Sequence, residues 1–85
     1  MHRIALDSTT LASVLYSPDR CLLDLEFRNG AVYHFFDVPP PTYRELLEAD
    51  SKGAYFNRNI RNRFRYQQVR QPSHTARWQP PSKTK

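Results

Sequence analysis

The sequence has one cysteine, Cys21, and only two glycines, and this scarcity excludes several kinds of protein. A single cysteine forms neither an internal disulfide nor a cysteine-rich zinc site, which suits a reducing compartment. The three histidines are scattered, without a recognisable metal-binding spacing. No apolar run approaches the roughly 18 residues that span a bilayer, and the polar first residues do not resemble a signal peptide. We expect a cytoplasmic protein with no metal, other cofactor or membrane contact.

Acidic residues are absent from the whole second part of the chain. The first 50 residues hold all eight Asp and Glu and four Arg, which gives a formal charge of −4, whereas the last 35 residues hold nine Lys and Arg, which gives +9. The 85 residues are enough for one domain, and a domain of this size buries only roughly 60% of its unfolded surface. These features favour a binding surface over an enclosed site for a small-molecule substrate.

The first half of the sequence predicts antiparallel strands. Residues 1–8 read as a flexible lead-in, and residues 10–15 are rich in apolar and β-branched side chains that end at a Ser-Pro-Asp turn. Residues 21–27 alternate between apolar and polar side chains, which predicts a half-buried strand with Cys21 on its inner face. Residues 31–36 follow an Asn-Gly turn and predict the third strand.

The register of the second hairpin decides which side chains are buried, because a slip of one residue exchanges the two faces. A two-residue Asn-Gly turn would place Leu25 beside His34. A three-residue turn over residues 28–30, with a left-handed glycine, would place Leu25 beside Tyr33 and Asp24 opposite His34. We favour the second, because it buries aromatic side chains with leucines.

Three consecutive prolines at 39–41 end the sheet, since proline cannot donate to a neighbouring strand but is welcome in the first turn of a helix. A short amphipathic helix is expected over the following ten residues or so. A second helix begins near Ser51, a good N-cap, and places Phe56, Ile60 and Phe64 on one stripe. It should end before Arg65, because residues 64–69 have enough β character for a fourth strand.

Together these elements predict an α+β fold in which a three- or four-stranded antiparallel sheet is covered by one or two short helices. A single domain is expected over residues 9–69. Residues 70–85 contain little that is apolar besides Trp78, so they predict a disordered basic tail.

Three stretches carry a family resemblance: Tyr33-His34-Phe35, FDVPPPTY at 36–43 and SKGAYFNRNIR at 51–61. In this order they resemble the KTSC domain, over about residues 9–66. The family is named for its occurrence at the C-terminus of some lysyl-tRNA synthetases and also occurs alone in small bacterial proteins. It has no established activity, and its fusion to a tRNA-charging enzyme suggests RNA as a ligand. The resemblance implies no catalytic residue, and the family's Tyr-x-Tyr motif has lost its second hydroxyl here.

The candidate site is the basic and aromatic stretch at residues 51–70. Arginine and lysine attract phosphates, and aromatic rings stack on unpaired bases, so this composition is typical of nucleic-acid binding. The candidate residues are Lys52, Tyr55, Arg58, Arg61, Arg63, Arg65 and Tyr66. The alternatives are an ordinary solvated arginine face and tyrosines that only fill the core. The start of the second helix could hold a phosphate, or Ser51 could simply cap it.

A catalytic arrangement of Cys21, Asp24 and His34 is not expected. Cys21 and Asp24 are three residues apart on one strand and should therefore point to opposite faces. We accordingly expect a non-enzymatic module of low sequence specificity that binds RNA, either tRNA or a single strand. The alternative is a protein-interaction module that presents the same surface to an acidic protein, since tyrosine and arginine also dominate protein interfaces.

Overall fold

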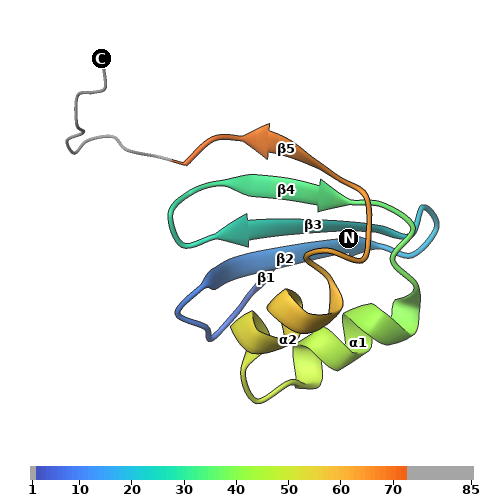
Figure 1. The fold of residues 1–85 in the computed structure, drawn as a ribbon, viewed down its shortest axis with the longest axis horizontal. Helices are drawn as coiled ribbons and strands as arrows, with labels where there is room; N and C mark the ends of the chain where they lie inside the picture. The colour runs from blue at the N-terminus through green and yellow to red at the C-terminus, as the bar shows by residue number, and fades with distance from the viewer. Residues whose placement is uncertain (1, 73–85) are drawn as a thin grey trace.

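The computed structural model describes residues 2–72, which form a five-stranded antiparallel sheet with two helices on one face (Figure 1). In chain order the elements are β1 (Ile4–Ala5), β2 (Leu11–Ser17), β3 (Leu22–Phe27), β4 (Val32–Phe35), α1 (Pro40–Glu48), α2 (Lys52–Asn59) and β5 (Tyr66–Arg70). The strands lie in the sheet in the same order as in the chain. The predicted α+β class is confirmed, with one strand more than expected. Neither helix of residues 2–72 is long and apolar enough to cross a membrane.

The additional strand lies in the segment that the sequence predicted to be a flexible lead-in. Ile4 pairs with Val14 of β2, and Leu6 is buried. The Arg28 side chain donates hydrogen bonds to the carbonyls of Leu6 and Ser8, both at 2.9 Å. This short strand could not be predicted, because two residues are too few to show an alternation of apolar and polar side chains. Of the tail predicted over 70–85, Arg70 ends β5, and residues 73–85 with Trp78 lie outside the described residues.

The favoured hairpin register is confirmed. Leu25 pairs with Tyr33, and Asp24 pairs with His34. Gly30 has φ 93°, the positive value that the three-residue turn requires. Cys21, in contrast, was wrongly placed inside a strand. It lies in the turn before β3 with φ 51° and is only partly buried, because β3 begins one residue later.

The helices bury one side of the sheet. Leu46 of α1, Phe56 of α2 and Ile60 at the end of α2 join the strand residues in a single core. The Ile60 N–H donates to the Phe56 carbonyl as α2 ends, well before Arg65, as expected. Gly53 lies where α2 approaches Thr10, the residue before β2, since a Cβ there would lie 3.0 Å from the Thr10 hydroxyl oxygen.

Tyr16 connects the sheet to the segment between β4 and α1. Its ring stacks on Tyr43 of α1 at a centroid distance of 4.5 Å, and its hydroxyl donates to the Val38 carbonyl at 2.5 Å. Burial, with Cys21 nearby, raises the pKa of Tyr16 to about 12. The phenol therefore stays protonated and can donate this hydrogen bond throughout the neutral range.

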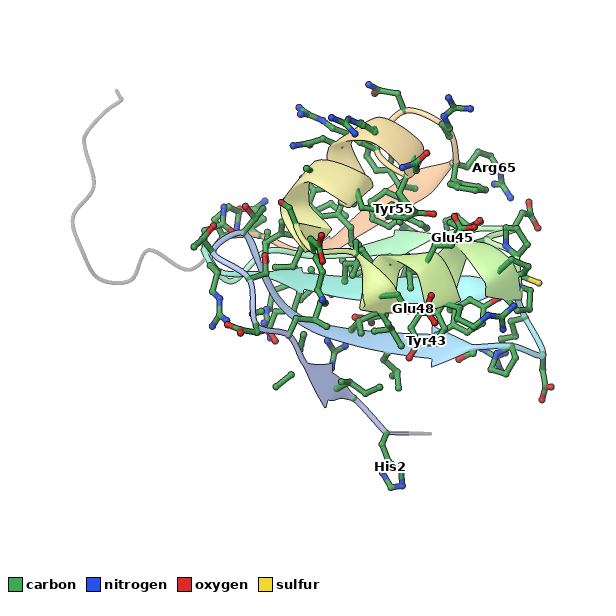
Figure 2. All side chains as sticks on the ribbon, turned by 90° about the horizontal axis from the view of Figure 1, so that it is seen from below. His2, Tyr43, Glu45, Glu48, Tyr55 and Arg65 are labelled. Atoms are coloured by element: carbon green, nitrogen blue, oxygen red, sulfur yellow. The ribbon has the colours of Figure 1, made fainter. Side chains whose placement is uncertain are left out.

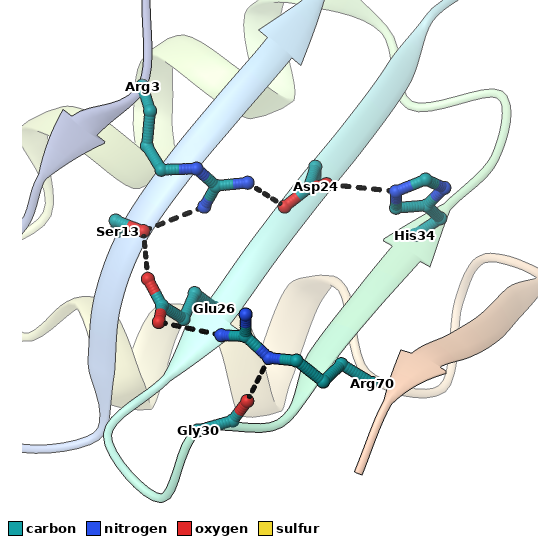
Figure 3. A network of polar contacts seen from close by, with 7 residues as sticks. All are labelled: Arg3, Ser13, Asp24, Glu26, Gly30, His34 and Arg70. Carbon is teal, nitrogen blue, oxygen red and sulfur yellow. Dashed lines mark hydrogen bonds and ion pairs between the residues drawn. The ribbon is translucent and has the colours of Figure 1, made fainter. Parts of the chain in front are cut away.

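The sheet face away from the helices carries a chain of polar contacts that joins its two edges (Figure 3). Arg3 donates to Ser13 at 2.7 Å, Ser13 donates to Glu26 at 2.7 Å, and Glu26 accepts from Arg70 of β5 at 2.9 Å. Arg3 also pairs with Asp24, whose other oxygen lies 2.9 Å from His34 Nε2. Both edge strands are thus held by side chains as well as by backbone pairing.

Removing the Tyr16 hydroxyl should destabilise the fold. We expect Tyr16→Phe to lower the free energy of unfolding by about 1–2 kcal/mol, because the buried Val38 carbonyl would lose its donor. Tyr43→Phe is the control, because it keeps the stacked ring and the Tyr43 hydroxyl makes no hydrogen bond within residues 2–72. Denaturant unfolding of both variants measures the difference. Equal stability of the two would contradict this role of the Tyr16–Val38 bond.

Glu26 should make stability depend on acid pH. The Ser13 hydroxyl bond lowers the pKa of Glu26, burial opposes this, and the charges of Arg70 and Arg3 lower it further. A folded-state pKa below the unfolded value gives stability that is full above the unfolded value and is lost as pH falls through the folded value.

We therefore expect Glu26→Gln to cost about 1 kcal/mol at pH 7, the scale of a partly exposed charged hydrogen bond, and less near pH 3. Urea unfolding at both pH values checks this. Glu48→Gln, an exposed carboxylate outside the network, should differ less from wild type at pH 7. A Glu26→Gln deficit that persists unchanged at pH 3 would contradict the assignment.

Candidate functional site

A groove runs between α2 and the last two strands of the sheet, because the helices do not cover the whole face. Figure 1 shows both helices lying toward the β1 and β2 side, away from β5. The groove has a volume of about 440 Å³. Its lining consists of Thr10, Phe27, Asn29, Ala31, Tyr33, Phe35, Phe56, Asn57, Arg61, Asn62, Tyr66 and Pro72. We call it the aromatic groove.

The floor of the aromatic groove is a cluster of rings held edge to face. Tyr33 of β4 lies at centroid distances of 5.6 Å from both Phe27 and Tyr66. Phe56 of α2 packs at 5.5 Å on Phe35. Such edge-to-face pairs are favourable beyond the area that they bury. Four of the five rings are buried or half-buried, whereas Tyr66 is 58% exposed to solvent.

Polar side chains line the side of the groove formed by α2 and the turn that follows it. Asn57, Arg61 and Asn62 are all exposed. Arg61 Nη1 donates to Asn57 Oδ1 at 3.5 Å, so the guanidinium and this amide lie together. At the far end, Asn29 Oδ1 accepts from the Ala31 N–H at 2.9 Å, which fixes the β3–β4 turn. The groove therefore combines ring faces, amides and one positive charge.

Two further arginines are within three residues of Arg61 in the chain, at and after the end of α2. Arg58 is in the last turn of the helix, and Arg63 Nε donates to the Arg58 carbonyl at 3.4 Å. All three arginines are exposed, and none is ion-paired with a carboxylate of residues 2–72. A helix C-terminus stabilises nearby cations, which gives this cluster a local structural cause as well. We call Arg58, Arg61, Arg63 and Tyr66 the arginine–tyrosine surface.

The side chains of the other predicted site residues contact other parts of the fold. Arg65 is 3.5 Å from Asp37, and its guanidinium lies 5.1 Å from the centroid of the Phe36 ring. Lys52 Nζ donates to the Ala49 carbonyl at 3.0 Å, and the Ser51 hydroxyl caps α2 by accepting from Ala54 N–H. These contacts fit ordinary capping of α2.

Tyr55 is held between the two helices, where Figure 2 shows it beside Glu45. Its hydroxyl donates to Glu45 Oε1 at 2.7 Å. Burial first, and then the hydrogen bond and negative charge of Glu45, raise the pKa of Tyr55 to about 12. The ring is half-buried against the core, so this tyrosine fits the role of a packing residue better than that of a stacking platform.

The opposite face carries His34 and Asp24, which pair as the register predicts. Cys21 lies in a turn, and its Sγ lies 3.9 Å from the Pro18 carbonyl oxygen. No group of three or more His, Cys, Asp or Glu within residues 2–72 is placed to hold a metal ion. His34 thus belongs to the network that joins the strands.

Sequence reasoning missed the groove itself and its amides. Tyr33 and Phe35 were expected to face inward, and they do, but the sequence does not say that the helices stop short of them. Asn62 was read only as a weak helix former, and Asn57 was not considered. Both alternate with arginine at the end of α2, and this alternation was the available signal for a polar wall there.

Comparisons with known proteins agree with this architecture. A family model described as "KTSC domain" matches residues 7–64. An uncharacterized protein of Stutzerimonas stutzeri is 41% identical over 78 residues, which cover 92% of this chain and 96% of the relative. A crystal structure of a KTSC domain protein from Yersinia pestis superposes with a TM-score of 0.76 at 29% identity and covers 80% of this chain and 96% of its own.

A third relative is much longer. A lysine–tRNA ligase of Nostoc is 43% identical over 54 residues, which are 64% of this chain and 10% of the ligase. The similarity thus concerns a small part of that enzyme.

Proposed function

This chain belongs to the KTSC domain family, and on that premise we propose that it is a non-enzymatic RNA-binding module of low sequence specificity. The observation that carries the proposal is that Arg61 and Tyr66 line one groove, and that Arg58 and Arg63 are exposed within three residues of Arg61 in the chain. Guanidinium groups without carboxylate partners are available for phosphates, and an exposed ring is available for stacking. The arginine–tyrosine surface would be the contact region.

The relatives give this ligand a second support. A similar stretch of 54 residues occurs within a lysine–tRNA ligase, a protein whose name identifies tRNA as its substrate. A small module beside such an enzyme could hold RNA without taking part in the chemistry.

Low specificity follows from the kind of contact. Phosphate contacts fix position without reading sequence, and stacking accepts any base, because every base has a ring face. Contact of the three arginines with about three phosphates of a single strand would give a slope of log K against log salt of about −2. Binding should therefore weaken steeply as salt rises.

A protein-interaction module is the alternative, and β5 gives one observation in its favour. All five residues of β5 are exposed, and within residues 2–72 this strand pairs only with β4. A free strand edge can accept an extended peptide as an additional strand. Tyr66 and Val69 would then contact the peptide side chains.

Removing two surface arginines should weaken RNA binding. We expect Arg58→Ala/Arg63→Ala to make the salt slope for single-stranded RNA less steep by about 1 to 1.5, because two phosphate contacts are lost. Fluorescence anisotropy with a labelled oligonucleotide at several salt concentrations measures this.

The matched control is Arg20→Ala/Arg44→Ala, which removes the same charge from exposed positions outside the surface and should leave the slope within about 0.5 of wild type. Equal slopes for the two double variants would show that only net charge matters. No saturable binding of tRNA or single-stranded RNA even at low salt, with a specific protein partner recovered by co-purification, would decide for the alternative.

A further inference from the structure

The aromatic groove has a composition that suits one particular part of an RNA chain. Its floor is apolar, and one ring at its mouth is exposed. Two of its three asparagines, Asn57 and Asn62, lie with Arg61 on the α2 side. A groove that only tracked phosphates would need none of the rings or amides. We propose that the groove binds one unpaired nucleotide, with the base against Tyr66 and a flanking phosphate at Arg61. This rests on the proposed function, because it takes RNA to be the ligand.

Contacts within the domain hold the Tyr66 ring in position before any ligand binds. Its ring is packed edgewise on Tyr33 at 66° and tilted at 45° to Phe35, with centroid distances of 5.6 and 5.7 Å. Strand pairing of Tyr66 with Phe35 holds its backbone. A ring that is already fixed loses little conformational entropy on binding, so more of the stacking free energy appears as affinity.

The two asparagines supply hydrogen-bonding groups for the edge of the base. Each side-chain amide has two N–H donors and one acceptor oxygen, which is the combination that the edges of all four bases can use. Asn57 is oriented by Arg61, whose guanidinium lies within reach of its oxygen at 3.5 Å. The amide of Asn57 and the cation of Arg61 thus lie as neighbours, as the base and phosphate of one nucleotide do.

The size and shape of the groove restrict the ligand to an unpaired base. A volume of about 440 Å³ lies within the range of small-ligand sites. In duplex RNA the base faces are covered by stacking and their edges by pairing, so neither Tyr66 nor the asparagines could be used. Unpaired bases in loops, bulges and single strands leave both their faces and their edges accessible.

The positive charge in the groove favours a nucleotide over a peptide that has no acidic residues. Arg61 lines the groove and has no carboxylate partner within residues 2–72. A positive charge beside apolar ring faces matches a ligand with an aromatic part and an adjoining negative charge. A nucleotide has both within one unit.

The test compares three labelled RNAs of equal phosphate number: a short single strand, the same backbone without bases, and a blunt duplex. Stacking of a base on an aromatic side chain is worth about 1–3 kcal/mol, so the single strand should bind roughly 5- to 150-fold more tightly than the abasic backbone. We expect Tyr66→Ala to remove most of this difference and to leave the abasic affinity and the salt slope unchanged.

Three further variants complete the design. Tyr66→Phe keeps the ring and should bind like wild type, and Val69→Ala alters another exposed residue of β5 without touching the groove. Asn62→Ala provides a second exposed groove position, should Tyr66→Ala fold poorly by circular dichroism, and should weaken only the single strand. NMR titration with adenosine monophosphate should shift the side-chain amide signals of Asn57 and Asn62.

The outcomes separate this inference from the proposed function. Equal affinity for single-stranded and abasic RNA, with no effect of Tyr66→Ala or Asn62→Ala, would overturn the groove assignment while salt-dependent RNA binding still stood. Absence of binding to any of the three RNAs at low salt would overturn both. A preference for the duplex would also contradict the groove assignment.

Discussion

The pairing of β3 with β4 through its three-residue turn is the constraint on which both faces of the sheet depend. With Leu25 opposite Tyr33 and Leu23 opposite Phe35, the leucines and aromatic rings point toward the helices. A slip of one residue would place Asp24 and Glu26 in the core and expose the leucines. The same register puts Asp24 beside His34 on the far face. Gly30, with its positive φ, therefore fixes the groove floor and the polar network together.

The groove exists because both helices lie toward the β1 and β2 side of the sheet face (Figure 1). Five strands at roughly 4.8 Å spacing make a sheet about 19 Å wide between the outer strand axes, and the part of that width near β5 is left without a helix above it. Phe56 and Ile60 complete the core over the central strands, and the rings of Tyr33 and Tyr66 are left beyond the helix edge. Because the helices cover only part of the sheet face, rings of a kind usually found in a core form the solvent-accessible floor of the groove.

Most of the fold was predictable from short-range patterns, and most of the site was not. Three local patterns each identify one element: the alternation in residues 21–27, the Asn-Gly turn and the prolines at 39–41. The hairpin register followed because only one of the two possible registers pairs leucines with aromatic side chains. The strand at Ile4–Ala5 could not be read, because two residues have no period. The pairing of Arg65 with Asp37 and the placement of Tyr55 between the helices arise from contacts between distant segments, which no local pattern encodes.

The uneven distribution of charge along the chain has a structural consequence. Carboxylates of the first half are used within the fold: Asp24 and Glu26 join the strands, Glu45 holds Tyr55, and Asp37 lies beside Arg65. Acids that are engaged in this way do not reach the end of α2. The guanidinium groups of the arginine–tyrosine surface have no carboxylate partner there within residues 2–72, next to a helix C-terminus that stabilises cations. Within the described part of the chain, the acidic half thus supplies the carboxylates of the ion pairs and leaves Arg61 without one at the aromatic groove.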